Sequence, residues 1–526
     1  MFQRLLICLA FSTCCFLNTW VELAEGDGVY FARYAPIYTV VIPVVCWEMT
    51  LTLGLFGAWE LCRRRPPKYP GLLHAIFLAI CLLPLGIMSI AALRILPIDL
   101  IPVIRNPWFW PAALLASLTP LGFAVLRPRT ASRFMRAVFL YSWVVLALVL
   151  FQGVRGTLLK YPPGAYADGP LAVSLRSPPP NIRVVWIIFD ELCQTITFGN
   201  RPAGLRLPNL DRLRSESFYA SSAIAPADST EQSIPALTIG EPVLEAIPDG
   251  PDDLRLRTPS RSTPSAWSSV PNVFDSARGL GFNTAVVGWY HPYGRVLNRS
   301  LTRCYWSPGW LLSGIEERLQ PQSLADAMWD RARLQLTVLP LVGHLPGVSG
   351  MYHRMEKAKQ FRYLLARAGE IVADASIGLA FIHIDIPHPP AIYSGSEGKI
   401  TPNGPIGYLD SVALVDRTLG ELRQKIDSAG LGNCTAVLVS ADHGWRTYLW
   451  RGGAEWTDTE EAASHNDTSG VPFLLKLPGQ TSGLAYNKRF NTVITRQLIT
   501  DILEGRLTES SRISDAIDRY RKNLRY

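Results

Sequence analysis

Hydrophobic residues are distributed along this chain in two different ways. The first third holds five long apolar runs, at about residues 5–22, 37–60, 71–93, 108–126 and 136–154. Each run is close to the ~20 residues that an α-helix needs to cross a bilayer. Runs this long, this closely spaced and this poor in charge are atypical of buried core helices. We therefore expect five membrane-spanning helices.

The loops between the runs predict their orientation. Basic residues gather between the second and third runs and between the fourth and fifth. They are Arg63, Arg64, Arg65 and Lys68, and Arg127, Arg129, Arg133 and Arg136. Such loops face the cytoplasm, which places the chain after residue 155 outside the cell (inner) membrane. The first run, after Arg4, is also compatible with a cleaved signal peptide. Glu48, in the second run, is either a hydrogen-bonded residue facing the bundle or a functional intramembrane carboxylate.

A different pattern follows a proline-rich linker at 155–181. Short β-rich runs occur at 184–189, 284–289, 379–384, 436–440 and 472–477, and helix-like stretches separate them. This alternation is typical of a doubly wound α/β domain with a mostly parallel sheet. We therefore predict a transmembrane domain at 1–154, the linker, and an extracytoplasmic domain at 182–526.

Charge supports a membrane interpretation over a nucleic-acid surface. Residues 1–160 contain 14 Lys and Arg against 6 Asp and Glu, whereas residues 161–526 contain 37 of each kind. The basic surplus thus lies wholly in the apolar third, and we expect no nucleic-acid partner. Only Cys193, Cys304 and Cys434 lie in the predicted outer domain, so it has at most one disulfide, and free thiols fit equally well.

Acidic residues follow two of the predicted strands. Asp190 comes after the run at 184–189, and Asp442 and His443 come after the run at 436–440. The carboxyl ends of parallel strands form the ligand-binding edge of such a sheet. A mixed set of oxygen and nitrogen ligands suits Zn²⁺ or Mn²⁺ better than Ca²⁺. Each acid taken alone is as compatible with a helix cap, and for Glu191 we favour a capping or supporting role.

Five further positions are candidates for catalysis or substrate binding. Thr230 opens a predicted short helix, where the dipole favours negative charge. His388 follows the run at 379–384, and His465 precedes the last run. Trp289 is the last residue of the run at 284–289 and His291 follows it, where they either line a substrate pocket or belong to ordinary packing.

Taken in order, these motifs resemble the alkaline phosphatase/sulfatase superfamily over about residues 181–505. Asp190 matches the family's first metal ligand, SADHG its late Asp-His pair, and FIHIDIPHPP its substrate-facing histidine segment. Thr230 stands ten residues before Gly240, where a sulfatase carries its formylglycine cysteine. The C-x-P-x-R pattern needed to make formylglycine is missing. A threonine at this position, after a membrane anchor, is similar to lipoteichoic acid synthase and the lipid phosphoethanolamine transferases.

The resemblance implies a reaction and a cofactor. One divalent metal, with a second not excluded, would be held by Asp190, Thr230, Asp442 and His443. Thr230 would accept a phospho-headgroup from a membrane phospholipid and pass it to an outer-surface glycan or lipid. His388 would contact the phosphoryl group or protonate the leaving oxygen, and His465 would serve the acceptor or a second metal. Two alternatives stay open: a sulfatase-like hydrolase, and a membrane-tethered binding protein with a degenerate site.

Overall fold

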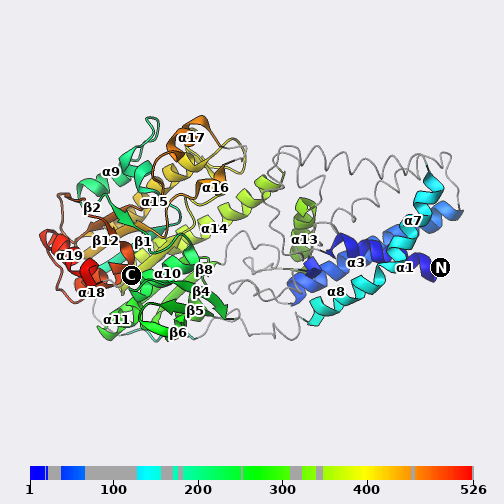
Figure 1. The fold of residues 1–526 in the computed structure, drawn as a ribbon, viewed down its shortest axis with the longest axis horizontal. Helices are drawn as coiled ribbons and strands as arrows, with labels where there is room; N and C mark the ends of the chain where they lie inside the picture. Colours follow the sequence, from blue (N-terminus) through cyan, green and yellow to red (C-terminus); the bar gives the residue numbers. More distant parts are fainter. Residues whose placement is uncertain are drawn as a thin grey trace. The chain divides into compact units, whose positions relative to one another are not determined.

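A computed structural model describes residues 1–17, 19–21, 37–64, 127–155, 170–175, 182–249, 253–307, 323–338, 348–451 and 456–523. These residues divide into two compact units. The first contains the described residues within 1–165 and 313–349, and the second contains those within 166–312 and 350–526. Each unit is described below by itself (Figure 1).

The first unit is helical. Its helices are α1 (Phe2–Cys15), α3 (Ile37–Arg64), α7 (Pro128–Tyr141), α8 (Trp143–Arg155) and α13 (Leu324–Val338). Two segments in the described part are long and apolar enough to cross a membrane, Val41–Leu61 and Ser132–Arg155. Side chains such as Leu53, Val144 and Phe151 are exposed on them, as expected of helices that face lipid.

The prediction of five membrane spans is therefore supported for two of them only. The run at 5–22 overlaps α1, whose 14 residues are fewer than a span requires. The runs at 71–93 and 108–126 lie outside the described residues. Glu48 faces the bundle, because its Oε1 accepts a hydrogen bond from the indole N–H of Trp20 at 2.8 Å. This is the hydrogen-bonded alternative for that carboxylate.

Helix α13 belongs to this first unit although it lies between two strands of the second in sequence. The indole N–H of Trp47 in α3 donates to the carbonyl oxygen of Met328 at 2.8 Å. Ala327 and Arg331, one helical turn apart, are both buried. The outer domain predicted from the sequence, 182–526, includes this helix.

The second unit is an α/β domain around an eight-stranded sheet of order β14-β2-β13-β12-β1-β9-β7-β8. The sheet strands are β1 (Arg183–Phe189), β2 (Phe218–Ala220), β7 (Asn283–Trp289), β8 (Arg303–Ser307), β9 (Ile377–Ile384), β12 (Thr435–Ala441), β13 (Phe473–Lys476) and β14 (Leu484–Tyr486). The strands from β12 to β8 pair in parallel, and β13 alone runs against its neighbours. The mostly parallel sheet is therefore confirmed, as are all five predicted strands.

Helices cover both faces of this sheet (Figure 1). They are α9 (Pro208–Ser215), α10 (Thr230–Ile239), α11 (Val273–Gly279), α12 (Tyr293–Val296), α14 (Val348–Val372), α15 (Tyr408–Ser428), α16 (Thr447–Trp450), α17 (Asp458–Ser464), α18 (Thr495–Leu503) and α19 (Ile513–Asn523). Every residue of β1, β9 and β12 is buried, as continuous hydrophobic strands between two helical layers should be.

Smaller sheets complete the second unit. One has three antiparallel strands, β4 (Glu245–Asp249), β5 (Asp253–Thr258) and β6 (Arg261–Ala266). Two pairs are β10 (Tyr393–Ser394) with β11 (Lys399–Ile400), and β3 (Ala223–Ile224) with β15 (Phe490–Asn491). The described part of the predicted linker, residues 170–175, lies along the main domain, because Leu175 exchanges hydrogen bonds with the side chain of Asn283.

Candidate active site

The sheet register brings the two acidic strand ends together. Strands β1 and β12 are adjacent and parallel, and Phe189 pairs with Ala441. The next residues, Asp190 and Asp442, therefore leave the sheet at the same level. Both side chains are fully buried. Thr230 joins them as the first residue of α10, whose first N–H groups have no acceptor within the helix.

Three side chains meet around the Thr230 hydroxyl. Its Oγ1 lies 2.7 Å from Asp442 Oδ2, 3.3 Å from Asp190 Oδ2 and 3.4 Å from His443 Nε2. His443 Nε2 also lies 3.3 Å from Asp190 Oδ1. The four residues expected to surround one cation thus converge in space, although they are far apart in the sequence.

The chemistry of this cluster fits a divalent cation. Ligand atoms of Asp190, Asp442 and His443 lie within 4.8 Å of one another. Asp190 Oδ1 is buried and has no hydrogen-bond partner in the described residues. His443 donates its Nδ1–H to the carbonyl oxygen of Gly444 at 2.9 Å, which leaves Nε2 unprotonated toward the cluster. A bound divalent cation would lower the pKa of the Thr230 hydroxyl and neutralise phosphoryl oxygens.

The pKa shifts of the two buried acids also favour a cation at this cluster. Burial, followed by the charge of Asp442, raises the pKa of Asp190 well above its ordinary value. Burial also raises the pKa of Asp442, but His443 and His383 outweigh it and the net shift is downward. Two adjacent buried carboxylates cannot both ionise cheaply without positive charge. A cation between them relieves this repulsion.

A second set of ligand atoms shares Asp190 with the first. It consists of Asp190, Glu191 and His388, all of them buried. His388 donates its Nδ1–H to the carbonyl oxygen of Pro389 at 2.7 Å, so its Nε2 is unprotonated. Burial, followed by the charge of Lys357, lowers the pKa of His388 well below its usual range. This histidine is therefore neutral and suited to accept a proton or bind a cation, rather than to donate a proton.

Glu191 has a supporting role in the backbone of the site. Its φ of 70° is unusual for a residue other than glycine. Its Oε1 accepts the backbone N–H of Arg446 at 2.6 Å, which ties the segment after β1 to the segment after β12. Burial raises the pKa of Glu191 to about 8. The supporting role expected for this residue agrees with these contacts.

Two basic residues near the acids were not found from the sequence. Lys357 of α14 is fully buried, and its Nζ donates to the carbonyl oxygen of His388. Burial lowers the pKa of Lys357, and the charges of Asp385 and Asp190 oppose that shift. Arg446 directly precedes α16, and the charges of Asp190 and Glu191 help to raise its pKa despite burial. The only signal in the sequence for Arg446 is its place just after the Asp-His pair.

The aromatic candidates lie behind the cluster. Trp289 is buried and donates its indole N–H to His383 Nε2 at 3.2 Å. His383 then donates its Nδ1–H to the Tyr293 hydroxyl at 2.9 Å. His291 is also buried, and its Nε2–H donates to the carbonyl oxygen of Thr230 at 3.1 Å. These contacts favour the packing alternative, in which Trp289 and His291 position other groups, and their role in substrate binding stays a prediction.

His465 is placed away from these contacts. It follows α17 with its side chain 71% exposed, and its ring lies 3.6 Å from Glu461 Oε1. The structure gives it no contact with Asp190, Thr230 or His388 among the described residues. The expectation that His465 serves the acceptor or a second metal has no support in this arrangement, because a helix end turns the side chain to solvent.

The Tyr408 hydroxyl stabilises the backbone next to the acids. Its removal should therefore lower the stability of the protein. Its hydroxyl donates to the carbonyl oxygen of Glu191 at 2.9 Å and accepts the N–H of Cys193 at 3.1 Å. Tyr408→Phe leaves two buried backbone groups without this partner, so we expect a loss of about 1–3 kcal/mol in unfolding free energy. Denaturant unfolding of the full chain in detergent measures the loss.

Tyr393→Phe is the matched control, because the Tyr393 ring is buried while its hydroxyl makes no hydrogen bond within the described residues. We expect its unfolding free energy to stay within about 0.5 kcal/mol of wild type. Equal stability of the two variants would contradict the bridging role of the Tyr408 hydroxyl.

Comparisons with known proteins agree with this geometry. The family model described as Sulfatase matches residues 183–504, more than half of the chain. No curated protein matches the chain.

Solved structures resemble it more distantly. One is the phosphonate monoester hydrolase of Agrobacterium radiobacter, at 15% identity and a TM-score of 0.40, covering 61% of this chain and 74% of that chain. Another is Ps i-CgsB in complex with k-i-k-neocarrahexaose, at 14% identity and a TM-score of 0.42, covering 64% and 76% of the two chains. Likenesses this weak add nothing to the family match.

Proposed function

The chain belongs to the sulfatase family of enzymes, and on that premise we propose that it is a phosphotransferase. It takes a phospho-headgroup from a membrane lipid and passes it through Thr230 to an outer-surface glycan or lipid. The observation that carries this proposal is the position of Thr230 Oγ1, 2.7 Å from Asp442 Oδ2 at the start of α10. A hydroxyl among buried acids and a histidine is placed as an activated nucleophile.

The chemistry proceeds in two balanced steps. In the first, Thr230 Oγ1 attacks the phosphorus of the lipid diester, its proton moves to the Asp442 carboxylate, and the bond to the lipid alcohol breaks. The departing alcohol oxygen takes up that proton from Asp442. In the second, the acceptor hydroxyl attacks phosphorus and gives its proton to His388, the bond to Oγ1 breaks, and Oγ1 takes up that proton from His388. The unprotonated Nε2 of His388 suits the removal of the acceptor's proton.

The helix N-terminus assists both steps. The first N–H groups of α10 point along the helix axis toward developing negative charge, and the dipole adds to this effect. The residues proposed to hold a divalent cation, with Zn²⁺ or Mn²⁺ favoured, are Asp190, Thr230, Asp442 and His443. We propose that the segments Val41–Leu61 and Ser132–Arg155 anchor the chain in the cell (inner) membrane with the α/β domain outside. An anchor raises the effective concentration of a lipid donor.

Hydrolysis is the second candidate. It shares the first step, and in the second step water takes the place of the acceptor. The family match supports it directly, since the matched family is named for hydrolysis of sulfate esters. The alternative of a binding protein with a degenerate site is disfavoured, because Asp190, Thr230, Asp442 and His443 converge intact.

The full chain in vesicles of defined phospholipid composition tests the proposal. We expect one phospholipid class to lose its headgroup, by mass spectrometry, and Thr230 to carry the phospho-group in protein quenched with acid. Added acceptor should discharge that adduct faster than water does. Headgroup release at the same rate with and without acceptor would favour the hydrolase. No adduct and no lipid turnover under any composition would overturn the phosphotransferase.

A further inference from the structure

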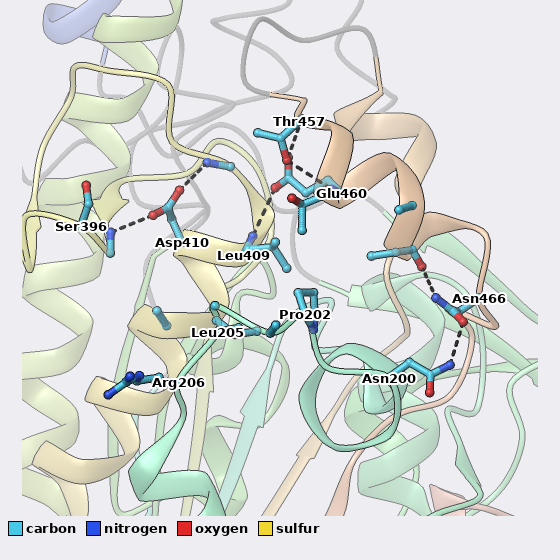
Figure 2. A pocket seen from close by; sticks show the side chains of 18 residues that line it. Asn200, Pro202, Leu205, Arg206, Ser396, Leu409, Asp410, Thr457, Glu460 and Asn466 are labelled. Carbon is cyan, nitrogen blue, oxygen red and sulfur yellow. Dashed lines mark hydrogen bonds between the residues drawn. The ribbon is translucent and has the colours of Figure 1, made fainter.

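A cleft separate from the acidic cluster opens at the same edge of the sheet. Its volume is about 970 Å³, within the range of small-molecule sites. Four segments line it, at 200–206, 395–396, 407–413 and 457–466 (Figure 2). These segments follow the carboxyl ends of β1, β9 and β12, the strands that end next to Asp190, His383 and Asp442. Ligands of doubly wound sheets bind at this edge.

The walls of the cleft are fixed by buried or half-buried carboxylates. Asp410 accepts the backbone N–H groups of Gly395 at 2.7 Å and Gly407 at 3.0 Å. Glu460 is 1% exposed and accepts the N–H groups of Leu409 at 3.3 Å and Thr457 at 2.9 Å (Figure 2). Both carboxylates thus hold separate segments together. A cleft built in this way is preformed, which lowers the entropic cost of binding.

One tyrosine links the backbone of the cleft wall to the backbone beside the acidic cluster. Tyr408 stands between two lining residues, Gly407 and Leu409, and its hydroxyl bridges Glu191 and Cys193. Asp190 directly precedes this bridged segment. The Tyr408 hydroxyl therefore connects a wall of the cleft to the segment that follows the first acid of the cluster.

The lining selects against charged ligands. Among the described lining residues Arg206 is the only basic one, and the two acids, Asp410 and Glu460, already accept backbone N–H groups. A phosphate-rich molecule would need more positive charge than one arginine supplies. A bare acyl chain would leave the polar groups of the rim without partners.

The remaining lining residues form an apolar floor with a rim of amides and hydroxyls. Leu205, Leu409 and Ala413 supply apolar surface. Ser396 and Thr459 supply hydroxyls. At one end, Asn200 donates to Asn466 Oδ1 at 2.8 Å, which leaves the Asn200 carbonyl oxygen available as an acceptor (Figure 2). An apolar ring face surrounded by hydroxyls matches this surface.

We infer that this cleft binds an uncharged sugar unit of the acceptor alcohol. The inference rests on the proposed phosphotransfer and narrows its acceptor from a glycan or lipid to a glycan. The sugar lies between α15 and α17, with its hydroxyls on the amide and hydroxyl rim. Binding of the sugar in the cleft thereby favours attack by a carbohydrate hydroxyl over attack by water.

A bulky residue in the cleft tests the inference. Ala462 is an exposed lining residue of α17, so Ala462→Trp fills the cleft from a surface position. Ala429, exposed at the end of α15 and absent from the lining, gives the matched control Ala429→Trp. Two rates are measured on the full chain in detergent. One is p-nitrophenol release from bis(p-nitrophenyl) phosphate, and the other is phosphotransfer to glycerol, glucose or maltotriose, detected by mass spectrometry.

We expect Ala462→Trp to lower transfer to maltotriose about tenfold more than it lowers p-nitrophenol release, and Ala429→Trp to change neither rate. Asn200→Ala combined with Asn466→Ala should shift the ratio in the same direction if the tryptophan variant folds poorly. Equal effects on both rates, or release without transfer to any of the three alcohols, would overturn the inference while the Thr230 chemistry stands. Absence of release in the wild type would instead count against the proposed function.

Discussion

Replacing Thr230 with alanine is expected to lower kcat by roughly 10⁴-fold or more, because no other hydroxyl takes its place among the acids. The hydroxyl lies within 3.4 Å of Asp190, Asp442 and His443. Removing it leaves both carboxylates and His443 Nε2 in place as cation ligands. Metal content, measured by elemental analysis, and the melting temperature should therefore stay close to wild type while headgroup release is lost.

Two variants separate loss of the nucleophile from damage to α10. Thr230→Ser keeps a hydroxyl on the same carbon and should retain measurable turnover and an acid-stable adduct. Thr238→Ala removes a buried hydroxyl of the same helix, which donates to Pro235 at 2.9 Å, and should keep kcat near wild type. Turnover by Thr230→Ala at a rate similar to that of Thr230→Ser would eliminate the covalent step.

The central strands were predictable because their physical signal is local. Strands of a parallel sheet covered on both faces are continuous hydrophobic runs, and β1, β9 and β12 are buried at every residue. β13 was found as a strand, but its antiparallel direction depends on how the chain returns to the sheet. β2 and β14 have three residues each, too few to show a period.

The metal-binding candidates were predictable for a related reason. Parallel strands end at one edge, so acids that directly follow two central strands meet when the strands are neighbours, as Phe189 and Ala441 show. Lys357 gave no such signal, because it lies in the middle of α14 and its partner carbonyl belongs to His388 in another segment. His465 was predicted at the sheet edge because it precedes a strand. It instead follows the end of α17, where its side chain is exposed.

The same distinction explains the N-terminal region. Hydropathy and loop charge identify apolar runs one at a time, and two of them form helices of spanning length. The contact of Trp47 with Met328 joins residues 281 positions apart, and no pattern within either helix announces it. Long-range contacts of this kind set which unit a segment belongs to, and they are settled by packing rather than by local sequence.

Asp442→Asn is expected to lower activity strongly and to change the stability of metal-free protein little. Asp442 Oδ2 faces the Thr230 hydroxyl, and Oδ1 accepts the N–H groups of Glu191 and His443. An amide retains one acceptor oxygen for that backbone but removes a charge from the cation site. Since several kcal/mol of charge stabilisation are at stake, we expect kcat/KM to fall by about 10²–10⁴-fold.

Stability of the same variant supplies the discriminating test. After chelation, wild type holds Asp190 and Asp442 buried side by side, and each raises the cost of ionising the other. Asp442→Asn relieves Asp190 of that repulsion but also removes a carboxylate whose pKa, despite burial, is lowered by His443 and His383, so its metal-free melting temperature should stay close to that of metal-free wild type. Added Zn²⁺ or Mn²⁺ should raise the melting temperature of wild type far more than that of the variant, because only a cation bound to the folded state stabilises it. Equal stabilisation of both proteins by metal would place the cation elsewhere, since Asp442 would then contribute nothing to its binding.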